Sequence, residues 1–388
     1  MRILVLNYEY PPLGGGAAPV CRDLAVCMAQ KGHQVTVVTM GYPGLPAFED
    51  TDGVKIHRLH CLRSKAHVCM PWEQLTFMEA AQRFLKRHLE SHTYDVCHTH
   101  FVIPTGPVAL WIRKNYGIPY VITAHGSDVE GYNEKPWMKA MHRLLRPAWR
   151  QVVRNAYAVC APSRFLLGLM EKEMPWKRYV YIPNGFDPEQ YKSDAFPKEK
   201  RILLMGRLQK SKNFQTVLQA FMKISQEAWG DWQADILGDG PFHEELELMT
   251  KAAGLTDRVK FRGWIENGSE AQLGYLKKAA IYISASHFEN CPMAVLEAAA
   301  AGCRPVLSDI EGHRQFFDTE TEADFFPADD AEGLSEILDR LMRKDPETLR
   351  TSIGMEKYSL QLITDRYLRL LSSCMQKGRR KAGTSEQS

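Results

Sequence analysis

The chain has 388 residues, of which 45% are hydrophobic and 24% are charged, as in ordinary globular proteins. A single hydrophobic core stops growing at roughly 250–300 residues, so this length predicts two domains. The formal net charge of +3 gives no indication of nucleic acid as a partner, and no stretch approaches the roughly 18 apolar residues of a membrane span.

Short apolar runs alternate with helical patterns through the first half of the chain. A strand is predicted at 2–6, followed by a Pro/Gly-rich loop and a helix at about 17–30. Further strands are expected at 34–39, 54–59, 95–98, 120–123, 156–161 and 179–182. This alternation predicts a parallel sheet covered by helices on both faces.

The polar stretch 189–200 interrupts the pattern and predicts a linker between a first domain, 1–188, and a second, 201–355. A helix at 356–375 is expected to return to the first domain, and the tail 376–388 to be disordered. Strands of the second domain are expected at 201–205, 233–237, 259–262, 280–284, 304–307 and 324–326. The predicted fold class is α/β, with two Rossmann-like, doubly wound parallel sheets.

Five loops follow predicted strands and carry glycines or charged side chains. Ligands of open α/β sheets bind at the carboxyl ends of the strands, so two facing domains predict one central cleft lined by these loops. The loops are 14–16, 125–128, 206–212, 238–241 and 289–293.

The segment SHFENCPMAVLEAAAAG contains two glutamates at the start of a predicted helix. Glu289 precedes the helix and Glu297 lies in its second turn. Two carboxylates here can bind different hydroxyl groups of a sugar and a ribose, while the N-terminus of the helix favours a phosphate. A surface glutamate beside a buried helix explains the pattern equally well.

Cations and glycines supply the other features of a phosphate site. Arg207 and Lys212 suit a diphosphate whose charge develops as it departs, although such pairs are often simply solvated. Gly15 and Gly16 allow a ligand to approach the backbone, but a flexible turn has the same composition.

Histidines and an aspartate mark the first domain. In TAHGSDV, His125 can hydrogen-bond a sugar hydroxyl, and Asp128 can orient an acceptor or cap a helix. His98 and His100 alternate on one strand face, yet no further ligands with metal-binding spacing accompany them, which favours a place at the cleft over a metal site.

The segment 135–154 is basic and amphipathic and has no acidic residue. Such a helix can lie on an anionic membrane, or it can pack within its domain with a solvated basic face. The cations are Lys135, Lys139, Arg143, Arg146, Arg150 and Arg154, and the apolar stripe is Trp137, Met141, Leu144, Leu145, Trp149 and Val152.

These motifs in this order resemble the GT-B glycosyltransferases, specifically the large retaining family four with its glycogen synthase-like and mannosyltransferase-like group-one transferases. The resemblance covers nearly the whole chain. It rests on Gly14–Gly16, HGSD at 125–128, PNGFD at 183–187, GRLQKSK at 206–212, LGDGP at 237–241, RGW at 262–264, and Glu289 with Glu297 eight residues apart.

The resemblance implies a function and a set of roles. The enzyme would transfer a hexose-type sugar, with retention, from a UDP-, GDP- or ADP-sugar to a hydroxyl acceptor, in glycan, polysaccharide or glycolipid biosynthesis, and without a metal or other cofactor. Arg207 and Lys212 would hold the diphosphate, Glu297 the ribose and Glu289 the sugar. His125 and Asp128 would act at the reaction centre, Gly15, Gly16 and Gly238 would approach the ligand, and Trp264 would receive the base.

The chain departs from many relatives at Asn290 and Pro292, where they have glycine. Because proline has no amide hydrogen, sugar contacts at this loop would come from Asn290, Cys291 or Met293. A dinucleotide-dependent oxidoreductase is disfavoured, since no G-x-G-x-x-G follows the first strand. A sugar-nucleotide epimerase and a non-catalytic sugar-nucleotide binding protein remain as alternatives on the same fold.

The expected location is the cytoplasm, with possible peripheral contact on the inner face of the membrane. The nine cysteines are irregularly spaced and favour free thiols. The N-terminal run MRILVLNYEYPP is too short for a signal peptide. A lipid-linked acceptor would fit the basic segment.

Overall fold

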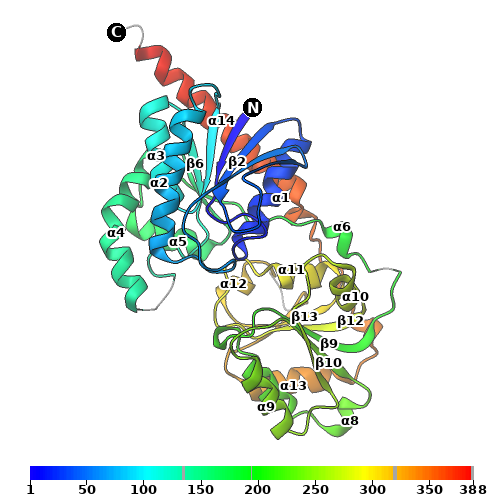
Figure 1. Ribbon diagram of the computed structural model, residues 1–388. Coiled ribbons are helices and arrows are strands. Elements are labelled where there is room, and N and C mark those ends of the chain that lie inside the picture. Colours follow the sequence, from blue (N-terminus) through cyan, green and yellow to red (C-terminus); the bar gives the residue numbers. More distant parts are fainter. Residues whose placement is uncertain (133–135, 194, 318–320, 386–388) are drawn as a thin grey trace. The chain divides into compact units, whose positions relative to one another are not determined.

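The computed structural model describes residues 1–132, 136–193, 195–317 and 321–385, with side chains up to residue 378. The chain forms two compact units (Figure 1). The first unit comprises Met1–Gly185 and Leu360–Ser388, and the second comprises Phe186–Ser359.

The first unit is built on an eight-stranded sheet in the order β3-β4-β2-β1-β5-β6-β7-β8, in which only the β3–β4 pairing is antiparallel. The hairpin strand β3 is absent from the sequence prediction because its polar residues do not alternate; Asp52 and Gly53 form its turn with positive φ angles. The strands are β1 (Arg2–Leu6), β2 (Gln34–Met40), β3 (Phe48–Thr51), β4 (Val54–Leu59), β5 (Val96–His100), β6 (Tyr120–Thr123), β7 (Val159–Ala161) and β8 (Tyr179–Tyr181).

Separate hydrophobic cores cover the two faces of this sheet. One core contains Phe77 and Leu166, and the other contains Leu24, Ile363 and Leu371. The first core is supplied by α2 (Pro71–His88), α3 (Thr105–Tyr116), α4 (Pro136–Asn155) and α5 (Arg164–Glu173), and the second by α1 (Ala17–Gln30) and α14 (Leu360–Ser385).

The second unit has a six-stranded, fully parallel sheet in the order β11-β10-β9-β12-β13-β14. Its strands are β9 (Glu199–Met205), β10 (Gln233–Leu237), β11 (Val259–Gly263), β12 (Ala279–Ser284), β13 (Arg304–Ser308) and β14 (Asp324–Phe326). Its helices are α6 (Pro188–Tyr191), α7 (Phe214–Phe221), α8 (Gln226–Trp229), α9 (His243–Ala252), α10 (Glu270–Lys278), α11 (Met293–Ala300), α12 (Glu311–Arg314) and α13 (Ala331–Met342).

Both sheets have a switch point, where the chain turns from building one side of the sheet to building the other. In the second unit the switch point lies between β9 and β12, which gives the strand order 3-2-1-4-5-6 of a Rossmann sheet. In the first unit it lies between β1 and β5. Loops that leave adjacent strands in opposite directions open a crevice at such a point.

The predicted linker at 189–200 is wrong in two respects. Helix α6 begins at Pro188, where the side chain of Asp187 accepts a hydrogen bond of 3.2 Å from the Glu189 amide, and β9 begins at Glu199. The polar composition of 189–200 suggested a linker, but the segment begins with a capped helical turn, and Tyr191 of this turn packs into the core of the second unit.

The C-terminal segment also differs from the prediction. Residues 356–358 form a 3₁₀ turn, and α14 begins at Leu360 and continues to Ser385, through most of the tail expected to be disordered. Good helix formers such as Lys, Arg and Ala prolong a helix that is already anchored by packing. Residues 386–388 lie outside the described residues.

No helix in the part of the chain that the structure describes is both long enough and apolar enough to cross a bilayer. All nine cysteines have free thiols.

Candidate active site

The switch point of the second unit brings together the loops after β9 and β12. Lys212 lies in the first loop and Glu289 in the second, and Lys212 Nζ lies 2.5 Å from Glu289 Oε1. The amide of His287 donates to the carbonyl oxygen of Ser211 over 3.0 Å, which joins the loops through their backbones. The two residues predicted from separate motifs are therefore direct neighbours.

Glu289 is held as a carboxylate. The hydroxyl of Ser286 donates to Glu289 Oε1 over 2.7 Å. Burial alone would raise the pKa of Glu289, but Lys212, His313 and the Ser286 hydrogen bond outweigh it and lower the pKa. Glu289 is thus ionised at neutral pH and can accept hydrogen bonds from hydroxyl groups.

Helix α12 fixes the loop that carries Glu289. A Cβ on Gly312 would lie 2.2 Å from the carbonyl oxygen of Glu289, so only glycine permits this close contact. Gln315 Nε2 donates to the carbonyl oxygen of Asn290 over 2.7 Å. These contacts hold the loop in place, and no local pattern in the sequence predicts either of them.

Glu297 occupies a different environment on α11. Its side chain is buried, and burial raises its pKa to about 7, with the hydrogen bond from Tyr191 opposing the shift. Burial raises the pKa of Tyr282, and the charges of Glu289 and Glu297 raise it further.

Helix α11 begins directly after the loop that carries Glu289. Pro292 takes the cap position and Met293 is the first helical residue. Asn290, Cys291 and Met293 are each half-buried beside Glu289 in the chain, and Cys291 Sγ lies 3.9 Å from Met293 Sδ. Their role toward a sugar stays a prediction.

Glycines bring the β9 and β10 loops into direct contact. Gly238 has a φ of +136°, and a Cβ there would lie 2.0 Å from the carbonyl oxygen of Gly206. Beside this contact Arg207 is exposed, and it forms no ion pair among the described residues. Trp264, which follows β11, is 73% exposed. Both side chains are accessible to a ligand.

The switch point of the first unit contains the glycine loop. The amide of Gly15 donates to Glu9 Oε2 over 3.2 Å, and a Cβ on Gly15 or Gly16 would meet nothing within 4 Å. Gly14 has a φ of +101° and lies against the Glu9 side chain. The loop is thus held on one side and open on the other.

Glu9 and Arg63 support this loop, and sequence reasoning missed both. Arg63 is fully buried and donates to the carbonyl oxygens of Tyr8, Lys65 and Ala66. Burial raises the pKa of Glu9, although Gly15 and Arg63 oppose the shift. The sequence offered one indication of Glu9, which is the single acidic residue in the largely apolar segment LNYEYPP.

Asp128 organises the HGSD loop. Its Oδ2 accepts from the Val102 amide over 2.6 Å, and its Oδ1 accepts from the His125 and Gly126 amides over 3.1 and 2.9 Å. The side chain is buried, and burial raises its pKa against these hydrogen bonds. These amides precede Asp128 in the chain, and the next helix, α4, begins only at Pro136, so Asp128 joins two loops rather than capping a helix. Orientation of an acceptor by Asp128 stays a prediction.

Three histidines meet at the ends of β5 and β6. His100 Nδ1 and His125 Nε2 share a hydrogen bond of 3.0 Å, and the rings of His98 and His100 lie 4.5 Å apart. Burial lowers the pKa of His125 to about 3, of His98 to about 4, and of His100 well below its usual range. All three are therefore neutral at physiological pH.

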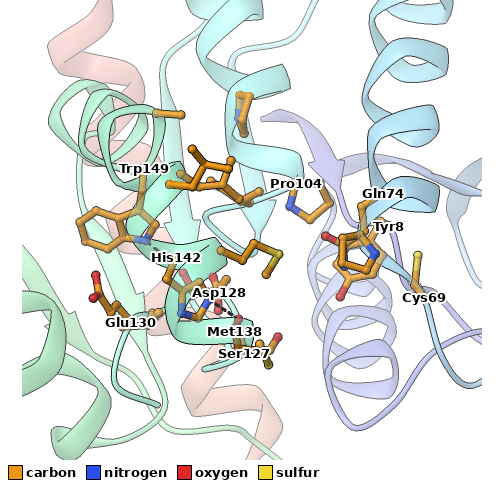
Figure 2. Close-up of a pocket in the computed structure, with 18 of the residues that line it drawn as sticks. Tyr8, Cys69, Gln74, Pro104, Ser127, Asp128, Glu130, Met138, His142 and Trp149 are labelled. Carbon is orange, nitrogen blue, oxygen red and sulfur yellow. Dashed lines mark hydrogen bonds between the residues drawn. The ribbon is translucent and has the colours of Figure 1, made fainter. Parts of the chain in front are cut away.

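A cavity of about 530 Å³ opens next to this loop, between α2 and α4 (Figure 2). Figure 2 shows Tyr8, Cys69 and Gln74 on one side and Met138 and Trp149 on the other. Most of the lining is apolar, and its polar groups include Glu9, Ser127 and Asp128.

Helix α4 carries the predicted basic amphipathic segment. Its apolar stripe lines the cavity from Trp137 to Trp149. Arg146 pairs with Glu130 over 2.7 Å and Arg150 with Glu173 over 2.5 Å. Lys135 lies outside the described residues.

Comparisons with known proteins establish the family of the chain. Residues 14–190 match the family model Glycosyltransferase Family 4, and residues 186–358 match Glycosyl transferases group 1. The chain is 26% identical to phosphatidyl-myo-inositol mannosyltransferase of Mycobacterium leprae, covering 89% of this chain and 88% of the relative. It is 25% identical to alpha-monoglucosyldiacylglycerol synthase of Streptococcus pneumoniae, covering 79% and 71%.

Solved structures share the two-unit architecture. Anabaena HepE, in complex with UDP-glucose, aligns with a TM-score of 0.72 and 17% identity, covering 96% of this chain and all of that one. At this identity the likeness establishes the fold. Since the two family models together span residues 14–358, the chain belongs to the GT-B glycosyltransferases of family 4, the group-one transferases.

Proposed function

We propose that the protein is a retaining glycosyltransferase that moves a hexose from a nucleotide-diphosphate sugar to a hydroxyl acceptor in glycan, polysaccharide or glycolipid biosynthesis. The observation that carries the proposal is the Lys212–Glu289 pair at the switch point, with the exposed Arg207 on the same loop and Glu297 on the following helix. Cations beside hydroxyl-binding carboxylates suit a ligand that joins a diphosphate to a sugar.

In this proposal donor binding rearranges the ion pair. Lys212 turns from Glu289 to the diphosphate, where Arg207 also binds, and the freed Glu289 carboxylate accepts hydrogen bonds from the sugar. Arg207, Lys212 and the N-terminus of α11 stabilise the charge of the departing diphosphate, so the proposed reaction includes no metal ion. The leaving phosphate takes the acceptor proton on the face it vacates, which retains the configuration.

The remaining donor roles follow from exposure and position. Glu297 binds the ribose, the exposed Trp264 receives the base, and Gly238 allows the ligand to approach the backbone. Asn290, Cys291 and Met293 shape the sugar pocket beside Glu289. Anabaena HepE, which shares the fold, was solved with UDP-glucose, and this supports a nucleotide-sugar donor.

On the acceptor side, a neutral His125 hydrogen-bonds a sugar hydroxyl rather than delivering a proton, because its pKa is far below neutrality. Asp128 holds the His125 loop, and Gly15 and Gly16 leave open backbone for a ligand. The basic face of α4 supports peripheral contact with an anionic membrane.

A donor panel tests the proposal. The purified protein is incubated with UDP-, GDP- and ADP-hexoses, and both thermal shift and slow hydrolysis of the sugar are measured. One nucleotide should raise the melting temperature and its sugar should be released with retained configuration. Recovery of an epimerised nucleotide sugar would favour the epimerase, and the absence of any response would contradict the proposal.

A further inference from the structure

The cavity between α2 and α4 is not explained by donor binding, because it lies wholly in the first unit. Its walls are apolar side chains of both helices, including Leu75 and Met78 on α2 and Met141 and Leu145 on α4. A volume of about 530 Å³ falls within the roughly 300–1,000 Å³ of small-molecule sites. The space is therefore large enough for a ligand, and the lining selects an apolar one.

Large hydrophobic side chains stand exposed where the cavity opens. Val68, Leu75, Trp137 and Leu144 all line it, and they are 40%, 63%, 54% and 79% exposed. Contiguous exposed apolar side chains around a concave site mark contact with a membrane or an apolar ligand. Tryptophan in particular favours the boundary between hydrocarbon and water.

Polar groups also line the cavity, and two of them adjoin the predicted acceptor side. Glu9 lines it and accepts a hydrogen bond from Gly15. Ser127 lines it too and is exposed, two residues after His125. A molecule that is apolar at one end and carries hydroxyl groups at the other matches a lining that combines apolar walls with polar groups beside the HGSD and glycine loops.

Positive charge borders the cavity along α4. The helix contains no acidic residue, and Arg143, Arg150 and Arg154 are all exposed on it. Arg146 and Arg150 are balanced by Glu130 and Glu173, which leaves Arg143 and Arg154 as cations without an ion pair among the described residues. Such a helix is complementary to the anionic surface of a bilayer, the source of chain-bearing molecules.

We propose that this cavity binds the hydrocarbon chain of a membrane-lipid acceptor, with its hydroxyl-bearing end toward Glu9 and Ser127. The proposal rests on the proposed glycosyl transfer and adds the acceptor class. Chain binding itself needs no donor, so it can be measured independently of transfer.

The binding test uses cis-parinaric acid, a fluorescent chain, displaced by 1-hexanol, 1-octanol, 1-decanol and 1-dodecanol. Displacement should strengthen by up to about fourfold per added methylene, as burial of each methylene predicts. Leu145→Asp should weaken probe binding at least tenfold, because it places a charge in the apolar cavity. Leu144→Asp, at the exposed mouth, should also weaken probe binding, because it removes apolar contact with the chain. Ala140→Asp, exposed on the same helix and outside the cavity, should bind as the wild type does.

The acceptor test compares matched molecules with and without chains: phosphatidylinositol against myo-inositol, and dodecyl glucoside against glucose, with the donor fixed by the panel above. Chain-bearing acceptors should have at least tenfold higher kcat/KM, and Leu144→Asp should remove this advantage. Equal probe binding by wild type and both cavity variants, or equal use of chain-free acceptors, would overturn the proposal. Probe binding without any donor response would instead contradict the transferase and leave the chain site standing.

Discussion

Glu289 and Glu297 are only eight residues apart, yet their pKa values shift in opposite directions. Both are desolvated, which raises the pKa of a carboxyl group. Glu289 faces Lys212 and the Ser286 hydroxyl, which reverse the shift, whereas Glu297 has only the Tyr191 hydrogen bond against it. One helix start thus holds a permanently ionised carboxylate and one that titrates near neutrality.

The Glu289→Ala variant should separate sugar transfer from nucleotide binding. Turnover should fall on the order of a hundredfold, as when a charge-stabilising group is lost. Binding of free nucleoside diphosphate should be unchanged or tighter, because Lys212 no longer has to leave an ion pair. Titration calorimetry with UDP, GDP and ADP measures this.

Glu311→Ala, an exposed carboxylate on α12, is the control and should change neither property. Loss of diphosphate binding in Glu289→Ala would show that this carboxylate contacts the nucleotide rather than the sugar.

The Glu297→Gln variant should stabilise the ligand-free protein in alkaline solution. The folded-state pKa of about 7 lies above the ordinary value of 4.5, so the folded protein binds the proton more tightly than the unfolded chain does. Ionisation then destabilises the wild type progressively from pH 4.5 to 7, by about 3 kcal/mol above that range. Urea unfolding at pH 8.5 should favour the variant by about this amount.

Well below pH 4.5 the advantage of Glu297→Gln should vanish, because the wild-type side chain is then protonated in both states. An advantage that did not depend on pH would mean that Glu297 is ionised without cost in the folded protein.

At the scale of elements, the site depends on loops that touch through their backbones. The β12 loop lies against Gly312 of α12, and the β9 loop lies against Gly238 at the end of β10. A side chain at either glycine would enter space that a carbonyl oxygen occupies. Short elements therefore position Glu289 and Arg207 without contributing a functional group.

The Gly312→Ala variant should displace Glu289 while the sheet persists. A Cβ would need to move the Glu289 carbonyl by about an ångström, and a shift of that size costs roughly a hundredfold in turnover. Gly274→Ala, in the middle of α10 with no atom within 4 Å of the new Cβ, is the matched control. It should keep wild-type turnover and gain up to about 1 kcal/mol of stability.

Measurements of donor hydrolysis and thermal unfolding on both glycine variants test whether the Gly312 contact positions Glu289. Wild-type turnover in Gly312→Ala would show that the contact does not position Glu289.

At the scale of the whole molecule, the first unit is discontinuous in sequence, because the last helix of the chain belongs to the unit that its first residues build. Helix α14 packs on α1, β5 and β6, and Ile363, Tyr367 and Leu371 are buried in that core. The first unit therefore cannot complete its sheet cover until the second unit has been synthesised.

Leu371→Ala should destabilise the first unit selectively. Removing this fully buried side chain should cost roughly 2–5 kcal/mol. Hydrogen exchange should then accelerate in α1, β5 and β6 but not in β9 to β14. Leu362→Ala, half-exposed on the same helix, should leave exchange unchanged. Faster exchange in the second unit would mean that the two units unfold together.

The sequence alone determined the α/β class, both parallel sheets and nearly every strand, because hydrophobic runs and loop composition are local properties of the chain. It also named Arg207, Lys212, Glu289 and Glu297, since strand-end loops carry function whatever surrounds them. The sequence-based prediction was wrong at α6, where a polar stretch forms a capped turn, and at α14, where a charged tail continues an anchored helix.

Only the tertiary structure determined which of those residues contact one another and how their pKa values shift. The Lys212–Glu289 pair joins residues 77 apart in the chain, and Arg63 reaches Tyr8 across 55. Ion pairing, desolvation and close backbone contact depend on distances that folding sets, and no local pattern encodes them. The cavity between α2 and α4 is of the same kind, because its walls come from segments that meet only when the first sheet is covered.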